Sequence, residues 1–288
     1  MTGANGMLGS SLCHILKNTA EVYAFHRDRK CYAKCSADFS LDLIDQSRLE
    51  KAFSRIKPDL VIHCAGLTNV DKCEKTPGQA YDANVAVTKH IAQICAKDTK
   101  LVYISTDQVY GEVDDYSESN LDLQPVNIYG KTKLQGERKV QEHCTNYTII
   151  RTNIFGWNIK PGRISSAEWV YHSLKNGKEI TLFTDYTFSP IYVECLGRII
   201  IELVQVAFSG VVNVGSPEPC SKYAFGMQLS EVFGFDNSLI VQGSIIKHHF
   251  QALRSNNLAL NTQKLVDLSI KVPAYKASIN YFYENRPL

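Results

Sequence analysis

Four short apolar runs alternate with helix-favouring stretches along the first half of the chain. The runs are residues 21–27, 59–66, 100–106 and 147–155, and the helical stretches are residues 8–18, 45–55, 79–97 and 129–144. Continuous apolar runs indicate strands that are buried on both faces, and helices between strands allow those strands to be parallel. The sequence therefore predicts an α/β fold with a Rossmann-type, doubly wound parallel sheet.

The pattern becomes less regular after residue 155. Residues 156–163 are typical of a loop and 165–176 of a helix, whereas 189–205 combine a strand edge with a helix and 210–219 a strand with a turn. We expect a dinucleotide-binding domain over residues 1–155, to which residues 190–215 return. A smaller, interwoven substrate lobe is expected over residues 156–189 and 216–288.

A glycine-rich turn, T-G-A-N-G-M-L-G, stands directly before the first helical stretch. Glycines at this spacing let the backbone approach a pyrophosphate, whose charge is favoured by the N-terminus of a helix. Taken alone, the pattern is equally typical of a flexible turn. Only Met1 and Thr2 precede the first glycine, although a strand needs about five or six residues. We expect the first strand to be truncated here and the natural chain to begin several residues upstream.

Composition excludes several classes of protein. The net charge of +2 provides no electrostatic footprint for nucleic acid or an anionic membrane, and no apolar run approaches the roughly 18 residues of a membrane span. The nine cysteines are scattered, and no second Cys or His pair follows Cys31 and Cys35 at zinc-site spacing. We expect a cytoplasmic protein with no metal site, no nucleic-acid partner and no membrane association.

Two polar motifs follow the glycine turn. The run 100–106 ends in Ser105 and Thr106, and Tyr129 and Lys133 lie four residues apart on a predicted helix. Residues at this spacing share a helix face, where a cation favours the ionised phenol and lowers its pKa. Each motif alone has an ordinary interpretation, either a capped strand end or a chance pair. Their occurrence in this order is seldom accidental.

These motifs resemble the extended short-chain dehydrogenase/reductase family, and within it the dTDP-4-dehydrorhamnose reductase group. The resemblance covers nearly the whole chain and includes "TGANGMLG", "STDQVYG", "PVNIYGKTKLQGE" and "IIRTNIFG". The chain departs from the group at Arg254-Ser255, where Arg-Pro is common, and at Asn153-Ile154, where a tryptophan is frequent. Both departures concern the substrate pocket, so the resemblance implies the reaction class and leaves the sugar open.

The resemblance implies a catalytic set, a cofactor set and a substrate set. Thr106 orients the substrate carbonyl, Tyr129 donates a proton to the developing alkoxide, and Lys133 lowers the tyrosine pKa and holds the nicotinamide ribose. The implied cofactor contacts are Gly3, Asn5, Gly6, Met7, Leu8, Gly9, Arg27, Arg29, Asp42, Leu43, Ala65, Gly66, Tyr129 and Lys133. The implied substrate contacts are Thr68, Asp71, Asp107, Gln108, Asn153 and Arg254. Asn84 stands where the family keeps a structural and relay asparagine, or it is a polar residue at the start of a helix.

The choice of cofactor depends on the end of the second strand, where His26-Arg27-Asp28-Arg29 presents two arginines and one acid. An acid in this position suits the ribose hydroxyls of NAD, whereas arginine suits the 2′-phosphate of NADP. We expect NADPH rather than NADH, with Arg27 as the phosphate contact. A solvated charged loop is the alternative interpretation.

The expected function is NADPH-dependent reduction of the 4-keto group of a nucleotide-linked 4-keto-6-deoxy sugar. Dehydratases of the family carry Asp-Glu where this chain has Asp107-Gln108, and an amide cannot remove a proton from the sugar. Two alternatives remain open. One is a sugar-nucleotide epimerase, and the other is a non-catalytic NADP-binding protein similar to the regulatory subunit of methionine adenosyltransferase. Related enzymes often dimerise through the helices equivalent to 79–97 and 129–144, which implies a homodimer.

Overall fold

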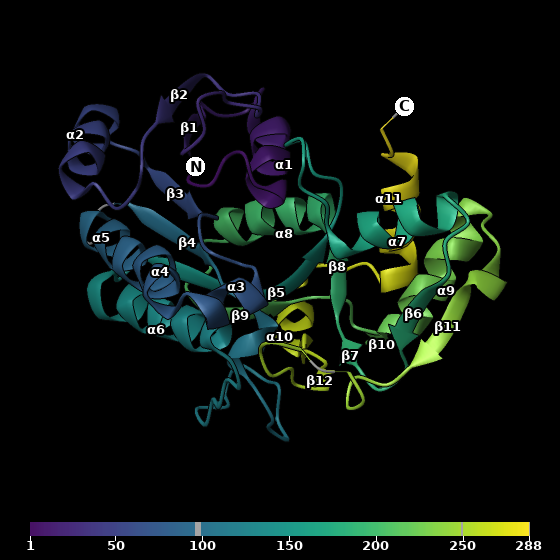
Figure 1. The fold of residues 1–288 in the computed structure, drawn as a ribbon. Helices are drawn as coiled ribbons and strands as arrows, with labels where there is room; N and C mark the ends of the chain where they lie inside the picture. The colour runs from purple at the N-terminus through teal and green to yellow at the C-terminus, as the bar shows by residue number, and fades with distance from the viewer. Residues whose placement is uncertain (96–98, 249, 288) are drawn as a thin grey trace.

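A parallel sheet organises the first half of the chain in the computed structural model, which describes residues 1–95, 99–248 and 250–287 (Figure 1). Its strands are β1 (Tyr23–His26), β2 (Ala37–Ser40), β3 (Leu60–His63), β4 (Lys100–Ile104), β5 (Tyr147–Phe155), β8 (Pro190–Tyr192) and β9 (Gly210–Val214). All pairings among them are parallel, and both β8 and β9 pair with β5. The predicted α/β fold with a parallel sheet is confirmed.

Met1 and Thr2 lie between β1 and β3, where the sequence analysis placed the first strand. Thr2 makes parallel bridges with Phe25 and with His63. Its N–H donates to the carbonyl of Ile62 at 3.0 Å, and the carbonyl of Met1 accepts from the N–H of Phe25 at 2.8 Å. These bonds join the pair β1–β2 to the strands that begin at β3.

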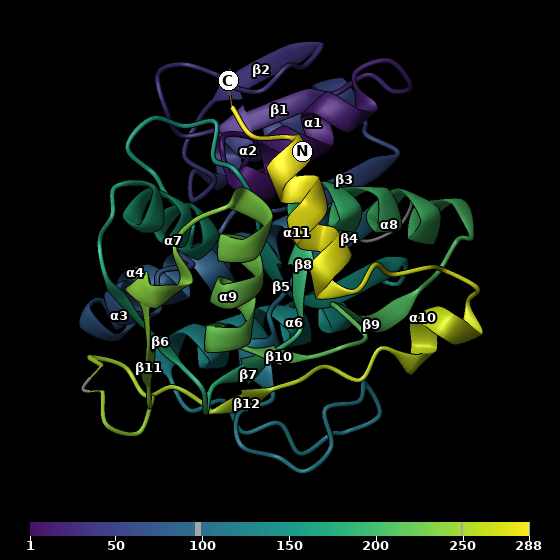
Figure 2. The ribbon, with the colours of Figure 1, turned by 90° about the vertical axis from the view of Figure 1, so that its right-hand side faces the viewer.

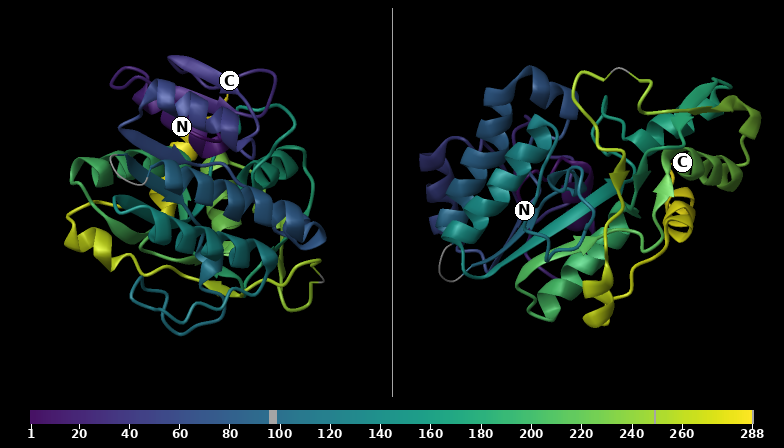
Figure 3. Two further views of the ribbon diagram at one scale, coloured as in Figure 1. Left: turned by 90° about the vertical axis from the view of Figure 1, so that its left-hand side faces the viewer. Right: turned by 90° about the horizontal axis from the view of Figure 1, so that it is seen from below.

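Helices cover both faces of the sheet (Figure 3). One layer contains α2 (Gln46–Ile56), α5 (Val87–Ile94) and α6 (Ile128–His143), and the other contains α1 (Met7–Leu16) and α8 (Val193–Gln205). Successive side chains of a strand point to opposite faces. Leu101 and Tyr103 therefore pack in the core beneath α2, α5 and α6, whereas Val102 packs in the core beneath α1 and α8.

The helical region before β4 is longer than predicted and is interrupted. It comprises α3 (Val70–Lys75), α4 (Pro77–Tyr81), the π-helical turn η1 (Asp82–Ala86) and α5. The predicted helix 79–97 extends into residues 96–98, which lie outside the described residues. Within the described ranges, no helix combines the length and apolarity needed to cross a membrane.

The second half adds small sheets and further helices (Figure 2). Strand β6 (Ile180–Phe183) pairs with β11 (Ile240–Gly243), and β7 (Thr187–Phe188) lies between β10 (Cys220–Ser221) and β12 (Asn257–Leu258). The helices are α7 (Ser166–Lys175), α9 (Lys222–Phe233), α10 (Gln263–Asp267) and α11 (Tyr275–Glu284), and short 3₁₀ turns are η2 (Asp107–Val109) and η3 (Asn237–Leu239). One core cluster contains both Val102 of the sheet and Phe282 of α11. The lobe boundaries expected from the sequence remain a prediction.

Candidate functional site

The glycine turn packs directly against the end of β3. Gly3 has φ +68°, and a Cβ at this position would lie 2.7 Å from the backbone nitrogen of Ala65. A Cβ at Gly9 would lie 2.4 Å from the carbonyl oxygen of Gly3. Helix α1 begins after Gly6 without a side-chain cap and without an acidic residue in its first turn. Its N–H groups and its dipole are therefore available to an anion.

A cavity of about 400 Å³ extends from this turn along the carboxyl edge of the sheet. It is lined by the following residues of the expected cofactor set: Gly3, Asn5, Gly6, Arg27, Asp42, Leu43, Ala65 and Gly66. Met7, Leu8 and Gly9, which begin α1, are not in the lining, and neither are Arg29, Tyr129 and Lys133, although all six were expected to contact the cofactor. The structure thus brings most of this set together and leaves Arg29 out.

Three cations that the sequence analysis missed also line the cavity, and one of them is Lys72 of α3. Lys160 and Arg163 come from the predicted loop 156–163. Lys160 forms an ion pair with Asp28, 132 residues earlier, and Asp28 also accepts a hydrogen bond from Asn5 at 3.0 Å. The bond from Lys160 holds the pKa of Asp28 below its ordinary value. A separation of this length leaves no local signal in the sequence.

The expected catalytic residues gather where β4 ends against α6. The hydroxyl of Thr106 accepts from the N–H of Gln108 at 3.3 Å and donates to Asp107 Oδ1 at 3.0 Å. Lys133 Nζ donates to the carbonyl of Ile104 at 2.6 Å and lies 4.0 Å from the centroid of the Tyr103 ring. Tyr129 is buried one helical turn before Lys133.

The electrostatics of this set differ from the expectation. Burial raises the pKa of Tyr129 well above its ordinary value, and a hydrogen bond with Thr106 opposes the rise. Burial also lowers the pKa of Lys133, to about 7, with the charge of Glu137 opposing. The expected lowering of the Tyr129 pKa by Lys133 is not what the structure shows, because burial disfavours the charged form of both groups.

Three of the expected substrate contacts form one cluster beside Thr106. Asn153 Nδ2 donates to Asp107 Oδ2 at 2.6 Å, and Gln108 Oε1 accepts from Asn127 Nδ2 at 3.0 Å. Asn127 also caps α6, because its Oδ1 accepts from the N–H of Gly130 at 2.8 Å. The cap therefore connects the start of the Tyr129 helix to the turn that follows β4.

The other expected substrate contacts lie at a different position. Arg254 Nη2 and Asp71 Oδ1 form an ion pair at 3.0 Å, and Asp71 also accepts from the N–H of Ala252 at 3.1 Å. Thr68 is exposed in the loop after β3. Asp71 and Arg254 thus bind each other and join α3 to the segment before β12.

A lysine that the sequence analysis missed lies beside Asp107. Lys222 begins α9, and its Nζ lies 3.4 Å from the centroid of the Phe188 ring. Burial raises the pKa of Asp107 to about 6, with hydrogen bonds from Asn153 and Thr106 and the charge of Lys222 opposing. Burial lowers the pKa of Lys222 to about 8, and the charge of Asp107 opposes this shift. No motif marks Lys222 in the sequence.

Two buried polar residues hold the surrounding loops in place. Asn84 accepts from the N–H of Leu67 at 2.8 Å and donates to Thr132 Oγ1 at 3.1 Å, which joins the loop after β3 to α6. It lies inside η1, so the alternative interpretation as a helix-start residue is wrong. His63 lies 2.7 Å from Thr2 Oγ1 and 3.0 Å from Thr88 Oγ1, which confirms its interpretation as a satisfied core group.

The fold and the site together define a class of protein. A glycine turn before a helix, a cavity at the carboxyl edge of a parallel sheet, and an adjacent threonine, tyrosine and lysine are the features of a dinucleotide-binding oxidoreductase. The family model described as RmlD substrate binding domain matches residues 1–286, and the chain belongs to this family.

Individual relatives agree with this assignment. The chain is 30% identical over 246 residues to the probable low-salt glycan biosynthesis reductase Agl14 of Haloferax volcanii, which covers 83% of this chain and 81% of that protein. It is 25% identical over 291 residues to methionine adenosyltransferase 2 subunit beta of Danio rerio, and this alignment covers 97% of this chain and 88% of that protein. A crystal structure of dTDP-4-dehydrorhamnose reductase from Bacillus anthracis in complex with NADP superposes on this chain with a TM-score of 0.86 at 27% identity. The superposition covers 99% of this chain and 98% of that one. The resemblance predicted from the sequence is confirmed.

Proposed function

We propose that this chain reduces the 4-keto group of a nucleotide-linked 4-keto-6-deoxy sugar, with NADPH as the reductant. The observation that carries the proposal is the gathering of Thr106, Tyr129 and Lys133 where β4 ends against α6. Membership of the family and the likeness to a reductase structure that contains NADP support the same reaction. The products are the 4-hydroxy sugar and NADP⁺.

The residues around the cavity fit NADPH. The close approach at Gly3 and the uncapped N-terminus of α1 suit a pyrophosphate, and Arg27 at the end of β1 suits a 2′-phosphate. Asp42 and Leu43 would lie beside the adenine, and Lys133 would hold the nicotinamide ribose. When bound, NADPH supplies the hydride that reaches the sugar carbonyl.

Side chains of this protein supply the proton and the orientation. Thr106 would turn its hydroxyl from Asp107 Oδ1 to the carbonyl oxygen when substrate binds, and Tyr129 would donate the proton that converts the developing alkoxide to an alcohol. The raised pKa of Tyr129 keeps the phenol protonated at neutral pH, so that it acts as an acid rather than a base. Gln108 offers an amide where dehydration would need a carboxylate, which argues against a dehydratase.

The test is incubation with NADPH and a panel of nucleotide-linked 4-keto-6-deoxy sugars, with cofactor oxidation followed by absorbance. Tyr129→Phe is expected to reduce turnover by roughly 10²- to 10⁴-fold, which is the range for a positioned general acid. NADPH affinity should stay nearly unchanged, since the ring still packs in place. Tyr281→Phe on α11 is the matched control, because this tyrosine is partly exposed. Near-normal turnover in Tyr129→Phe would contradict the mechanism.

Lys133→Met separates the two roles given to the lysine. The variant should lose turnover and should also bind NADPH more weakly, because a ribose contact disappears along with the charge. Isothermal titration with NADPH and a single-turnover assay measure the two effects independently. A loss of turnover with unchanged NADPH affinity would remove the ribose contact from the proposal.

A binding function is the second candidate, and the similarity to the methionine adenosyltransferase beta subunit over 97% of the chain favours it. On this reading no sugar in the panel is reduced by the wild type, while the chain associates with a methionine adenosyltransferase catalytic subunit equally well after Tyr129→Phe. An epimerase differs from both, since it changes the configuration of a hydroxyl without net oxidation of NADPH.

A further inference from the structure

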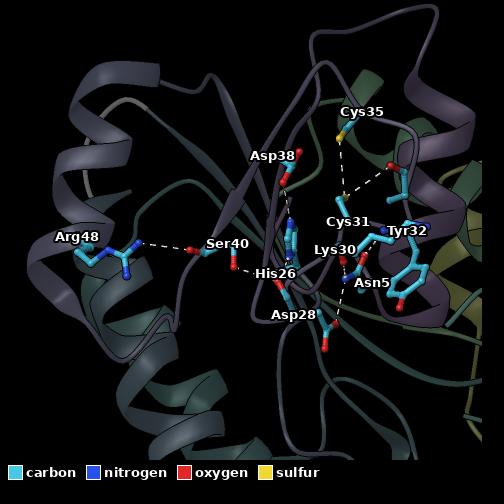
Figure 4. Close-up of polar contacts among 11 residues, drawn as sticks. Asn5, His26, Asp28, Lys30, Cys31, Tyr32, Cys35, Asp38, Ser40 and Arg48 are labelled. Atoms are coloured by element: carbon cyan, nitrogen blue, oxygen red, sulfur yellow. Dashed lines mark hydrogen bonds and ion pairs between the residues drawn. The ribbon is translucent and has the colours of Figure 1, made fainter. Parts of the chain in front are cut away.

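A histidine, a cysteine and an aspartate converge beside the cofactor cavity, between β1 and the following strand, and a second cysteine lies next to the first (Figure 4). One ligand atom each from His26, Cys31 and Asp38 lies within 4.8 Å of the others, and Cys35 Sγ is 4.0 Å from Cys31 Sγ. Strand pairing creates the arrangement. Ala24 of β1 pairs with Asp38 of β2, and His26, two residues further along β1, points to the same face.

The hydrogen bonds of His26 leave one ring nitrogen facing another acceptor. Nδ1 lies 2.9 Å from the carbonyl oxygen of Asp28, and a carbonyl only accepts, so Nδ1 carries the proton. In a neutral ring Nε2 then has a lone pair, yet it lies 2.8 Å from Asp38 Oδ2. His26 is only 4% exposed, so water does not separate the two atoms freely. A metal ion placed between Nε2 and Asp38 Oδ2 would be held by both atoms.

The cysteines favour a metal ion over a proton. A proton accounts for the His26–Asp38 contact alone, whereas a metal ion would also use the two sulfurs, whose present contacts are the weak ones of Cys31 Sγ with the Ala33 carbonyl oxygen and with Cys35 Sγ. Their separation of 4.0 Å is far longer than a disulfide bond of about 2 Å. It is close to the roughly 3.8 Å that separates two thiolates of a tetrahedral zinc site with Zn–S bonds of about 2.3 Å. A histidine that ligates a metal commonly donates its other N–H to a backbone carbonyl, as Nδ1 does here.

We propose that His26, Cys31 and Asp38 bind one zinc-type divalent cation, and that Cys35 moves from its place beside Cys31 to complete a tetrahedral site. Two thiol protons are released to solvent when the ion binds. The side chain of Asp38 is 48% exposed, which gives the ion an entry path and lets the carboxylate move the fraction of an ångström that coordination needs.

The sequence analysis expected no metal site because it searched for two Cys or His pairs. His26 and Asp38 do not form such a pair, since they belong to adjacent parallel strands on either side of the cysteine loop. The ion would fix the segment between β1 and β2. Asn5 of the glycine turn already holds this segment, because its Oδ1 accepts from the N–H of Tyr32 at 2.7 Å. The proposed metal therefore has a structural role at the rim of the cofactor cavity.

Cobalt substitution tests the site directly. The full-length protein is stripped with a chelator under reducing conditions and titrated with Co²⁺. Sulfur-to-cobalt charge-transfer absorption and tetrahedral visible bands are expected to saturate at one ion per chain and to disappear when zinc is added. Cys31→Ser should abolish the charge-transfer band and His26→Gln should weaken binding at least tenfold. Cys144→Ser is the control, because Cys144 lies at the end of α6, where a serine can keep the hydrogen bond to the carbonyl of Asn146.

The zinc content of protein purified without chelator provides a second readout, which does not depend on any enzymatic activity. About one zinc per chain is expected in the wild type and in Cys144→Ser, and almost none in Cys31→Ser. The proposal is overturned by the absence of a cobalt spectrum in fully reduced protein or by an unchanged spectrum in Cys31→Ser. A Cys31–Cys35 disulfide in freshly purified protein also overturns it. An unchanged spectrum in Cys35→Ser would remove Cys35 from the ligand set.

Discussion

Burial displaces the pKa values of four residues in the site toward their neutral forms. It raises the pKa of Tyr129 and of Asp107, and it lowers the pKa of Lys133 and of Lys222. The opposing contributions, from Glu137 on Lys133 and from Lys222 on Asp107, do not cancel the effect of burial. A site of this kind keeps its proton donors protonated near neutral pH, and it makes stability depend on pH.

Asp107→Asn should remove one such dependence. The pKa of Asp107 rises from 3.8 to about 6 on folding, so its stabilising contribution is fully present below about pH 4 and is lost as the pH rises through about 6. The free energy of unfolding of the wild type, minus that of the variant, should therefore fall by about 2 kcal/mol between pH 4 and pH 7, since one pKa unit corresponds to about 1.4 kcal/mol. Urea titrations at several pH values measure this difference, in which other titrating groups cancel. A difference that stays flat with pH would contradict the assignment.

Lys222→Met provides the control for that experiment. The charge of Lys222 is one of the contributions that lower the pKa of Asp107. Removing it should therefore shift the midpoint of the Asp107 transition to higher pH. The measurement is the same set of urea titrations, repeated with Asp107→Asn in the Lys222→Met background. An unmoved midpoint would show that Lys222 does not act on Asp107.

At the scale of elements, a buried ion pair holds α6 to β5 beneath the catalytic residues. Glu137 Oε2 and Arg151 Nη2 lie 2.7 Å apart, and their side chains are 2% and 5% exposed. Glu137→Gln should lower the free energy of unfolding by about 3–5 kcal/mol, because the guanidinium stays buried without its counter-charge. Chemical denaturation followed by circular dichroism measures the loss.

The same helix offers the matched control. Glu142 pairs with Lys139 at 2.5 Å, and its side chain is 53% exposed. Glu142→Gln should therefore lower the free energy of unfolding far less than Glu137→Gln, because solvent screens surface pairs. Equal losses in the two variants would indicate that burial does not decide the strength of the Glu137–Arg151 pair.

The sequence predicted those elements whose burial is uniform along the chain. Strand β4 (Lys100–Ile104) and the first half of strand β5 are largely apolar, because parallel strands are covered on both faces. Strand β2 (Ala37–Ser40) was missed because three of its four residues are exposed, and its conformation depends on pairing with β1. Strands β7 and β10 have two residues each, which is too short for any periodic signal.

Residues of the candidate site were likewise predicted where they belong to a local sequence pattern and missed where they do not. Thr106, Tyr129 and Lys133 were found because they belong to contiguous motifs on a strand end and one helix face. Lys160 and Lys222 were missed because each reaches the site through tertiary packing, Lys160 by an ion pair with Asp28 and Lys222 by stacking on Phe188. Local patterns do not record contacts of this kind.

At the scale of the whole molecule, the cavity is enclosed by segments from distant parts of the chain. The glycine turn and the end of β1 form one side, and the loop between β5 and α7 adds Lys160 and Arg163 on another. Lys160 is paired with Asp28, so its charge is partly balanced within the protein. Arg27 and Arg163 are the lining arginines. Which of these cations binds the 2′-phosphate of NADPH decides how the cavity discriminates between the two nicotinamide cofactors.

Arg27→Ala should weaken NADPH binding selectively. A hydrogen bond to a charged partner contributes about 1.5–3 kcal/mol, so the dissociation constant for NADPH should rise roughly 10- to 100-fold. NADH lacks the 2′-phosphate, and its affinity should therefore change little. Arg29→Ala is the matched control, since it removes the same charge two residues away from a side chain that does not line the cavity. Fluorescence titration of each variant with both nucleotides gives the four constants. Equal losses for NADPH and NADH, or equal losses in the two variants, would exclude Arg27 as the phosphate contact and leave Arg163 as the lining arginine to test next.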